Sequence, residues 1–241
     1  MQYSEFAYVY DSLMHEDIDY DKWCDYIENL FAMHGSEVDS ICELACGTGN
    51  ITSVLERRGY KITASDISED MLSVAKEKLN NTKLICSDMS ELCLKKKYDA
   101  FLCMIDGLNY VVIPERVQRT LKNVKKALNE NGVFIFDISS RYKLKNIIGN
   151  ETFIHSDYDI FYSWQNRYLE KHSLSDMLLN FFVRDGESYS RFEERHLQRG
   201  WSEKQLRKML ADAGFSEITT YSELTFSAPE KNSERIVFVC K

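Results

Sequence analysis

A short segment with two glycines has the composition of a nucleoside-binding loop. Residues 41–50 read ICELACGTGN and fall between an expected strand and an expected helix, where open α/β sheets bind their ligands. Gly47 and Gly49 lack side chains, so the backbone can turn sharply and lie against a ligand. Asp66 follows seventeen positions after Gly49, and its carboxylate could accept hydrogen bonds from both hydroxyls of a ribose. This spacing predicts an adenosine site.

Two features distinguish this loop from a dinucleotide site. Thr52 stands where the third glycine of the Gly-x-Gly-x-x-Gly pattern would be, so close helix packing over a pyrophosphate is not provided. Glu43 lies at the end of the expected strand, where its charge would repel a phosphate and attract an ammonium group. The ligand implied is an adenosine with a cationic or zwitterionic tail, which fits S-adenosylmethionine.

The elements that position the loop alternate between strands and helices. Apolar runs that predict strands cover residues 38–45, 60–65, 84–86, 98–104 and 133–138. Helical patterns accompany them at residues 20–34, from Ile51 to Gly59, from Ser68 onward, and from Pro114 to a helix end at Asn131-Gly132. Such alternation implies parallel strands with right-handed crossovers, and apolar runs without alternation suit a sheet covered on both faces. We therefore expect an α/β fold with a doubly wound, mostly parallel sheet.

The pattern changes after about residue 150. Apolar side chains recur at alternate positions in residues 154–164 and 177–183, which indicates antiparallel strands. Asp185-Gly186 predicts a tight hairpin, and residues 189–197 form an extended run after it. We interpret residues 151–200 as an antiparallel β insertion.

The chain closes with a helix and two strands. Ser202 and Gln205 predict a capping box, and Gly214 ends the helix that follows. Residues 215–221 and 235–240 predict a hairpin at the sheet edge. We expect one structural domain made of lid helices and a binding core (1–150), the insertion (151–200), and a segment that completes the core sheet (201–241).

These segments resemble the motifs of class I S-adenosylmethionine-dependent methyltransferases. Four stretches carry the resemblance, namely residues 43–50 (ELACGTGN), 63–72 (TASDISEDML), 86–89 (CSDM) and 131–137 (NGVFIFD), with Tyr98-Asp99 opening the fourth strand. The match covers residues 38–140 in the right order, so it is far more specific than a lone glycine loop. The resemblance implies a Rossmann-like fold with a seven-stranded sheet, S-adenosylmethionine as cofactor and S-adenosylhomocysteine as product.

The flanking segments are similar to a narrower bacterial group, the uncharacterised YqeM-like methyltransferases. The shared stretches are residues 20–23 (YDKW), 106–110 (DGLNY) and 181–186 (FFVRDG). This likeness extends over almost the whole chain, and it supplies no acceptor because the group has none firmly assigned.

Candidate cofactor ligands come from the motifs and from the aromatic N-terminal segment. Spacing and charge favour Glu43, Gly47, Gly49 and Asp66, and the matched motifs also imply Ala45, Ile67, Met71, Asp88, Met89 and Met104. Tyr3, Tyr10 and Trp23 could fold over the cofactor as a lid, or belong to an amphipathic helix packed on the sheet. Asp88 could instead cap a short turn, and the methionines could be plain core residues. We expect no metal site, because the seven cysteines lack ligand spacing.

Candidate catalytic residues fall in two places. Asp106, Asn109 and Tyr110 follow the fourth strand, at the mouth toward which the methyl group should point, although a polar loop there explains them equally well. His155 and His196 lie in the insertion, where such enzymes often recognise the acceptor, and solitary histidines are also common as surface or structural residues. A base is needed only if the acceptor is a protonated amine or a hydroxyl; Asp106 and the two histidines are the candidates.

Composition limits the partners. The chain has 241 residues and a net charge of -8, so its surface repels nucleic acid at long range. It shows neither a secretory signal nor the ~18 consecutive apolar residues of a membrane span, so we expect a cytoplasmic protein. The main hypothesis is a methyltransferase with a small-molecule acceptor. A methyltransferase acting on RNA or protein, a non-catalytic S-adenosylmethionine-binding module and a nicotinamide oxidoreductase are the alternatives, and the oligomeric state is left open.

Overall fold

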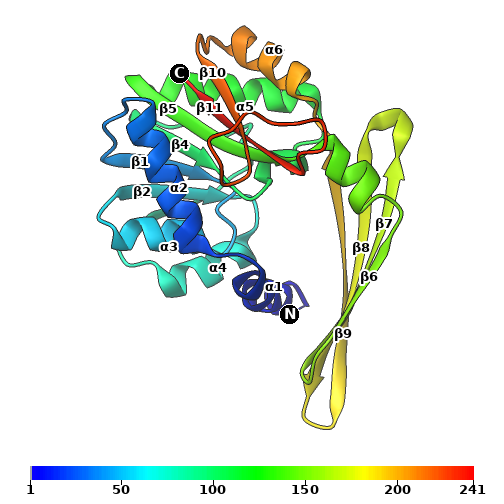
Figure 1. Ribbon diagram of the computed structural model, residues 1–241. Coiled ribbons are helices and arrows are strands. Elements are labelled where there is room, and N and C mark those ends of the chain that lie inside the picture. The colour runs from blue at the N-terminus through cyan, green and yellow to red at the C-terminus, as the bar shows by residue number, and fades with distance from the viewer. Residues whose placement is uncertain (1) are drawn as a thin grey trace.

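A computed structural model describes residues 2–241, with side chains for residues 7–15 and 17–241. It consists of an α/β core and a second, antiparallel sheet that extends from the core as a long arm (Figure 1). Helix α1 (Gln2–Asp17) lies between the core and this arm (Figure 1). Within residues 2–241, no helix combines the length and the apolar character needed to cross a membrane.

The core sheet has seven strands in the order β10-β11-β5-β4-β1-β2-β3. Their bounds are β1 (Ser40–Leu44), β2 (Lys61–Asp66), β3 (Lys83–Cys86), β4 (Tyr98–Cys103), β5 (Leu128–Ser139), β10 (Ile218–Ser222) and β11 (Arg235–Cys240). Strands β1 to β5 pair in parallel, whereas β11 runs antiparallel to both of its neighbours. The predicted fold class, a mostly parallel seven-stranded sheet, is confirmed. The carboxyl ends of β1, β2, β4 and β5 therefore meet along one edge, where the candidate residues were expected.

Helices cover both faces of this sheet. They are α2 (Tyr20–Met33), α3 (Asn50–Arg57), α4 (Glu69–Lys78), α5 (Pro114–Ala127) and α6 (Glu203–Ala213). Ile41 of β1 packs in a cluster with α2 and α3, and the next residue, Cys42, packs in a second cluster with α5 and α6. Leu102 and Phe101 of β4 divide between the same two clusters. Because both faces are buried, the strands lack polar alternation.

Local signals near the helix ends act as predicted. Ser68 caps α4 by accepting a hydrogen bond from the N–H of Met71. Ser202 and Gln205 form a capping box at α6, and Gly214 ends that helix in a left-handed conformation. These contacts are local, which is why the sequence pattern sufficed to find them.

One predicted helix end is wrong. Helix α5 ends at Ala127, and Asn131-Gly132 lies inside β5 rather than after the helix. A Cβ added at Gly132 would lie 2.8 Å from Cδ2 of Leu128 and 3.0 Å from the carbonyl oxygen of Asp99. The glycine therefore allows β4 and β5 to approach closely where their pairing is irregular.

The insertion is a four-stranded antiparallel sheet, as predicted. It comprises β6 (Thr152–Ser156), β7 (Ile160–Leu169), β8 (Leu174–Asp185) and β9 (Ser188–Arg199), and Asp185 pairs with Ser188 across the predicted hairpin. Tyr162, Phe181 and Phe192 form one row on the face toward α1. The opposite face carries ion pairs, such as that between Arg195 and Asp176, together with exposed apolar side chains such as Phe161 and Leu197. The sheet is thus amphipathic, with its apolar face toward the core.

Three short helical turns complete the chain. They are η1 (Gly107–Tyr110), the π-helix η2 (Lys143–Ile147) and η3 (Glu170–His172). The turn η2 connects β5 to the arm, whereas η1 follows β4 at the carboxyl edge of the core sheet and leads into α5.

We expect Gly107→Ala to destabilise the protein by about 1–3 kcal/mol, the usual cost of overpacking. The added Cβ would lie 2.9 Å from Cβ of Ala45 and 3.1 Å from Sγ of Cys103, so η1 would have to move away from β1. Urea denaturation measures the change in the free energy of unfolding. Gly200→Ala is the control, because the nearest atoms there are at 3.4 Å. Equal destabilisation by both substitutions would refute the close-packing role of Gly107.

Candidate functional site

The glycine loop that follows β1 borders open space. Ala45, Gly47 and Gly49 all have positive φ angles, 51°, 54° and 77°, so the loop turns sharply before α3. A Cβ added at Gly49 would come within 3.1 Å of Cβ of Ala75, whereas one added at Gly47 would meet no atom within 4 Å. Gly49 is therefore needed for packing against α4, and Gly47 leaves room for a ligand against the backbone.

Asp66 binds this loop directly. Its carboxylate accepts hydrogen bonds from the N–H of Gly47 (2.8 Å) and from the N–H of Ser68 (2.9 Å). Burial raises the pKa of Asp66 above its ordinary value, and the N–H donors oppose that rise. The two oxygens retain lone pairs beyond these bonds, so Asp66 could also accept hydrogen bonds from a ribose at the open side of Gly47.

Glu43 lies beneath the loop. Only 3% of its surface is exposed, and its carboxylate accepts a hydrogen bond from the hydroxyl of Thr52 on α3. Burial, together with repulsion from Asp66, raises its pKa to about 7 despite the bond from Thr52. Its carboxylate is thus turned toward α3, away from the open side where the sequence analysis placed an ammonium group.

The remaining motif residues surround the loop in different ways. Asp88 accepts a hydrogen bond from the N–H of Ser90 (2.7 Å) and pairs with Arg116 (3.3 Å), so it does cap a turn after β3. Ile67 is 67% exposed beside Asp66. The three methionines differ, as Met104 is buried in the core, Met89 packs partly against it, and Met71 packs with α1 and the arm.

Helix α1 is fastened to the glycine loop through Asp11, which the sequence analysis missed. Its carboxylate accepts hydrogen bonds from the hydroxyl of Thr48 (2.6 Å), from the amide of Asn50 (3.0 Å) and from the ammonium of Lys78 (2.6 Å). These bonds outweigh the effect of burial and lower the pKa of Asp11. No local signal could have revealed the contacts, because they join residues at least 37 positions apart.

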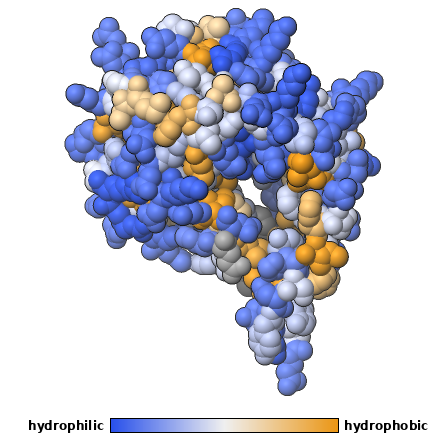
Figure 2. Space-filling model, viewed as in Figure 1, coloured by the Kyte–Doolittle hydropathy of each residue, from blue (hydrophilic) through white to orange (hydrophobic). Residues whose placement is uncertain are grey.

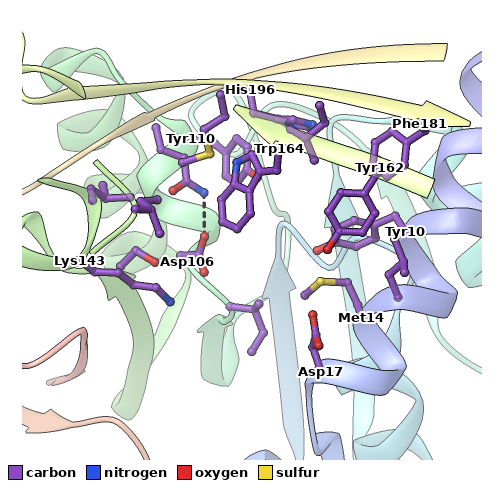
Figure 3. A pocket seen from close by; sticks show the side chains of 18 residues that line it. Tyr10, Met14, Asp17, Asp106, Tyr110, Lys143, Tyr162, Trp164, Phe181 and His196 are labelled. Carbon is purple, nitrogen blue, oxygen red and sulfur yellow. Dashed lines mark hydrogen bonds between the residues drawn. The ribbon is translucent and has the colours of Figure 1, made fainter. Parts of the chain in front are cut away.

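A cavity of about 230 Å³ lies beside this helix, enclosed by α1, by the carboxyl edge of the core sheet and by the arm (Figure 3). Tyr10, Met14 and Asp17 line it from α1. The apolar face of the arm supplies Tyr162, Trp164, Met177, Leu179 and Phe181. In the space-filling view, apolar side chains border the hollow between the core and the arm (Figure 2).

The wall opposite α1 centres on Asp106 (Figure 3). Ile105 and Asp106 both have left-handed backbone conformations, and Asp137 of β5 accepts hydrogen bonds from both of their N–H groups, at 2.6 and 2.9 Å. Arg235 of β11 pairs with the carboxylates of Asp106 (2.8 Å) and Asp137. Gln198 on β9 donates a hydrogen bond to Asp106 at 2.7 Å, which joins the arm to the core.

The charge of Asp106 is set by its neighbours. Burial alone would raise its pKa, but attraction by Arg235 and Lys143 and the hydrogen bonds from Arg235 and Gln198 lower it below the ordinary value. Asp106 is therefore a buried anion at neutral pH and a weak base.

The other predicted catalytic residues separate into two groups. Tyr110 and His196 line the cavity and contact each other edge to face, with ring centroids 5.8 Å apart. Asn109 is fully buried, and its amide bonds to the backbone of Ser139 and Arg199, so it braces the loop. His155 stays on the edge strand β6, where it stacks on Tyr162 and bonds to Asp157 outside the cavity lining.

The predicted lid residues also have different positions. Tyr10 lines the cavity, and burial raises its pKa well above the ordinary value. Trp23 is 4% exposed and packs in the core between α2 and the sheet, as the alternative interpretation expected. The side chain of Tyr3 is outside the described residues.

Comparisons with known proteins agree with this geometry. Residues 41–132 match a family described as a methyltransferase domain. The chain is 35% identical to "Putative methyltransferase YqeM" of Bacillus subtilis, over 99% of this chain and 96% of that protein. The chain belongs to the S-adenosylmethionine-dependent methyltransferases, within the group of YqeM.

Solved structures support the same assignment. A crystal structure of an S-adenosylmethionine-dependent methyltransferase from Clostridium acetobutylicum is similar over 99% of this chain and 98% of that chain, with a TM-score of 0.90 and 37% identity. Streptomyces venezuelae DesVI shares the fold at 20% identity, with a TM-score of 0.82 over 97% of each chain. S-adenosylmethionine is thus the cofactor, and the open side of Gly47 next to Asp66 is a suitable place for its nucleoside.

We expect Asp66→Asn to weaken binding of S-adenosylhomocysteine about 10- to 100-fold, because hydrogen bonds to a charged group contribute roughly 1.5–3 kcal/mol. Calorimetric titration measures the affinity. Glu69→Gln in the first turn of α4 is the control, because Glu69 is exposed and should leave the affinity unchanged. An unchanged affinity in Asp66→Asn would remove Asp66 from the cofactor site.

We expect Glu43 to make the protein less stable as the pH rises. Its pKa is about 7 when folded and near 4.5 when unfolded, so the folded state binds the proton more tightly between these values. This contribution is complete below pH 4.5 and is lost through pH 7, a change of about 3 kcal/mol. Urea denaturation at pH 5 and pH 8 should show a smaller loss of stability in Glu43→Gln than in the wild type. The same loss in both proteins would contradict the raised pKa.

Proposed function

We propose that this methyltransferase transfers the methyl group of S-adenosylmethionine to a small molecule bound in the cavity between α1 and the arm. The observation that carries the proposal is the position of this half-open cavity beside α1, the helix that bonds to the glycine loop. Asp11 bonds α1 to the loop through Thr48. Other side chains of the same helix line the cavity, namely Tyr10, Met14 and Asp17.

The size of the cavity suits a small acceptor. An apolar cavity of roughly 150 Å³ in a protein holds benzene. A cavity of about 230 Å³ therefore admits a molecule of one or two rings, but not a folded macromolecule. The net charge of -8 also opposes binding of RNA. Both facts favour a small molecule over the RNA or protein acceptor considered as the alternative.

Distant relatives carry names with similar acceptors. One relative from Streptomyces venezuelae is named as an N,N-dimethyltransferase of a dTDP-linked amino sugar, and it is 25% identical over 46% of this chain. Another, from Rickettsia canadensis, is named as a ubiquinone biosynthesis O-methyltransferase, with 28% identity over 52% of this chain. These names support a small acceptor and leave the acceptor atom open.

The chain contributes mainly by positioning. S-adenosylmethionine supplies an electrophilic methyl group and a neutral thioether as leaving group. Gly47 and Asp66 would hold the nucleoside, with Asp88 near the adenine, while Tyr10 and Trp164 exclude water from the cavity. Holding the reactants in line can lower the barrier by ~7–11 kcal/mol. Asp106, Tyr110 and His196 then orient the acceptor from the opposite wall.

Two measurements test this function. We expect S-adenosylhomocysteine, but not NAD, to raise the melting temperature, because a ligand that binds the folded state stabilises it. We also expect label from methyl-labelled S-adenosylmethionine to enter the small-molecule fraction of a bacterial extract. Label in the RNA or protein fraction would contradict the small acceptor, and binding without transfer to any fraction would indicate a non-catalytic module.

A further inference from the structure

We infer that the acceptor is a small amine, which the cavity binds as an ammonium ion against Asp17 and aromatic rings, and which His196 deprotonates before methyl transfer. This inference rests on the proposed function and specifies its substrate class.

Asp17 is an uncompensated carboxylate at the cavity. It lies seven residues after Tyr10 on the same face of α1, and the two side chains line the cavity with Met14 (Figure 3). Its side chain is exposed at the rim of the cavity, and among residues 7–15 and 17–241 its carboxylate has no hydrogen bond and no ion pair. Asp17 is close enough to Tyr162 on the arm to raise the pKa of its hydroxyl, in addition to the effect of burial. A cation between α1 and the arm would meet this charge.

Aromatic rings surround the same space. Tyr10 of α1 packs beside Tyr162 and Phe181 of the arm on one side of the cavity, and Trp164 of the arm lies farther along it (Figure 3). The faces of such rings attract cations by ~0.5–2 kcal/mol each, most strongly where water is excluded. They also pack against the carbon skeleton of an acceptor. A phosphate or carboxylate has no comparable attraction to these walls.

The two cations near the cavity differ in their partners. Arg235 forms ion pairs with Asp106, Asp137 and Glu223. Lys143 of η2 lines the cavity and attracts Asp106 electrostatically, without an ion pair among the described side chains.

Glu194 of β9 lies directly opposite Leu179 of β8 in the strand register, so its side chain is on the face of the arm that borders the cavity. Burial and repulsion from Asp70 raise its pKa. Carboxylates therefore outnumber cations around the cavity, which favours a cationic acceptor and opposes an anionic one.

His196 is the group suited to accept the proton. It lines the cavity on β9, two positions from Gln198, and burial lowers its pKa, so it is neutral at pH 7. Asp106 is held as an anion by Arg235 and is a weaker base. The titratable groups facing the cavity with His196 are Tyr10 and Asp17 on α1, Asp106 and Tyr110 after β4, Lys143 on η2, and Tyr162 and Glu194 on the arm.

One N–H proton of the bound ammonium moves to the imidazole of His196, which leaves a neutral amine with a lone pair. The lone pair forms a bond to the methyl carbon while the carbon–sulfur bond breaks, and that bonding pair stays on sulfur as a neutral thioether. The product is a methylated ammonium, and His196 then releases its proton to solvent.

The first test measures binding without turnover. Protein saturated with S-adenosylhomocysteine is titrated with phenethylamine, phenethyl alcohol and phenylacetate, which share a skeleton and differ in charge. We expect the amine to bind at least tenfold more tightly than the alcohol, and phenylacetate most weakly. Asp17→Asn should remove the preference for the amine, and the control Asp159→Asn, at an exposed turn of the arm, should retain it. Equal binding of amine and alcohol by the wild type would overturn the inference.

The second test addresses His196. A positive imidazole repels an ammonium, and burial lowers the pKa of His196 below its ordinary value. Amine affinity in the wild type should therefore fall only at acidic pH, where His196 gains its proton, and stay constant in His196→Gln. With labelled S-adenosylmethionine, transfer to phenethylamine should be independent of pH from 7 to 9 in the wild type. In His196→Gln it should rise about tenfold per pH unit, because the amine must then lose its proton to solvent. Identical pH profiles would overturn the role of His196.

The outcomes separate the two proposals. If label enters the alcohol or the carboxylate, or does not enter the amine, the inference of an amine acceptor is wrong. If the protein still forms a stable complex with S-adenosylhomocysteine in that case, the proposed methyltransferase function stands. Failure of the wild type to bind S-adenosylhomocysteine overturns the proposed function itself. Unchanged affinity of His196→Gln for S-adenosylhomocysteine shows that this variant is folded.

Discussion

The ion pair between Arg235 and the carboxylates of Asp106 and Asp137 is the constraint on which the acceptor side of the structure depends. Asp137 fixes two consecutive left-handed residues after β4, and a buried carboxylate without a partner is costly. The neutralising cation comes from the last strand, because the antiparallel register places Arg235 opposite Ser139. The antiparallel strand β11 thus supplies the positive charge that stabilises the buried carboxylates of Asp106 and Asp137. Removal of Arg235 would leave these two carboxylates buried together.

The sequence was informative where contacts are short in range. Gly47, Gly49 and Asp66 belong to one strand–turn–helix unit and its neighbour, so their spacing alone placed them around one loop. Asp11 and Arg235 were not predicted, because their partners Thr48 and Asp106 lie 37 and 129 positions away and neither residue has a distinctive local pattern. Long-range polar contacts require the fold before their partners can be paired.

The two histidines show a second limit. Both occur in the arm, and alternation places His155 in line with Tyr162 and His196 in line with Met177 on the same sheet face. Alternation assigns a face but not a position along the strand or across the sheet. Only the register of four strands shows that His196 lies by the core and His155 on the outer edge. Asn131-Gly132 shows the same limit. Glycine suits both the end of a helix and a close contact between strands, so the residue type alone did not distinguish the two.

Helix α1 joins the two halves of the site. Asp11 on one side of the helix bonds to Thr48 in the cofactor loop, while Tyr10 and Asp17 on the adjacent side form a wall of the acceptor cavity. Val9 packs against Phe181 of the arm, so the helix also holds the arm near the core. A rigid helix cannot change one of these contacts without the others. Helix α1 is therefore shared by the cofactor loop and the cavity, so a substitution that displaces it would alter both.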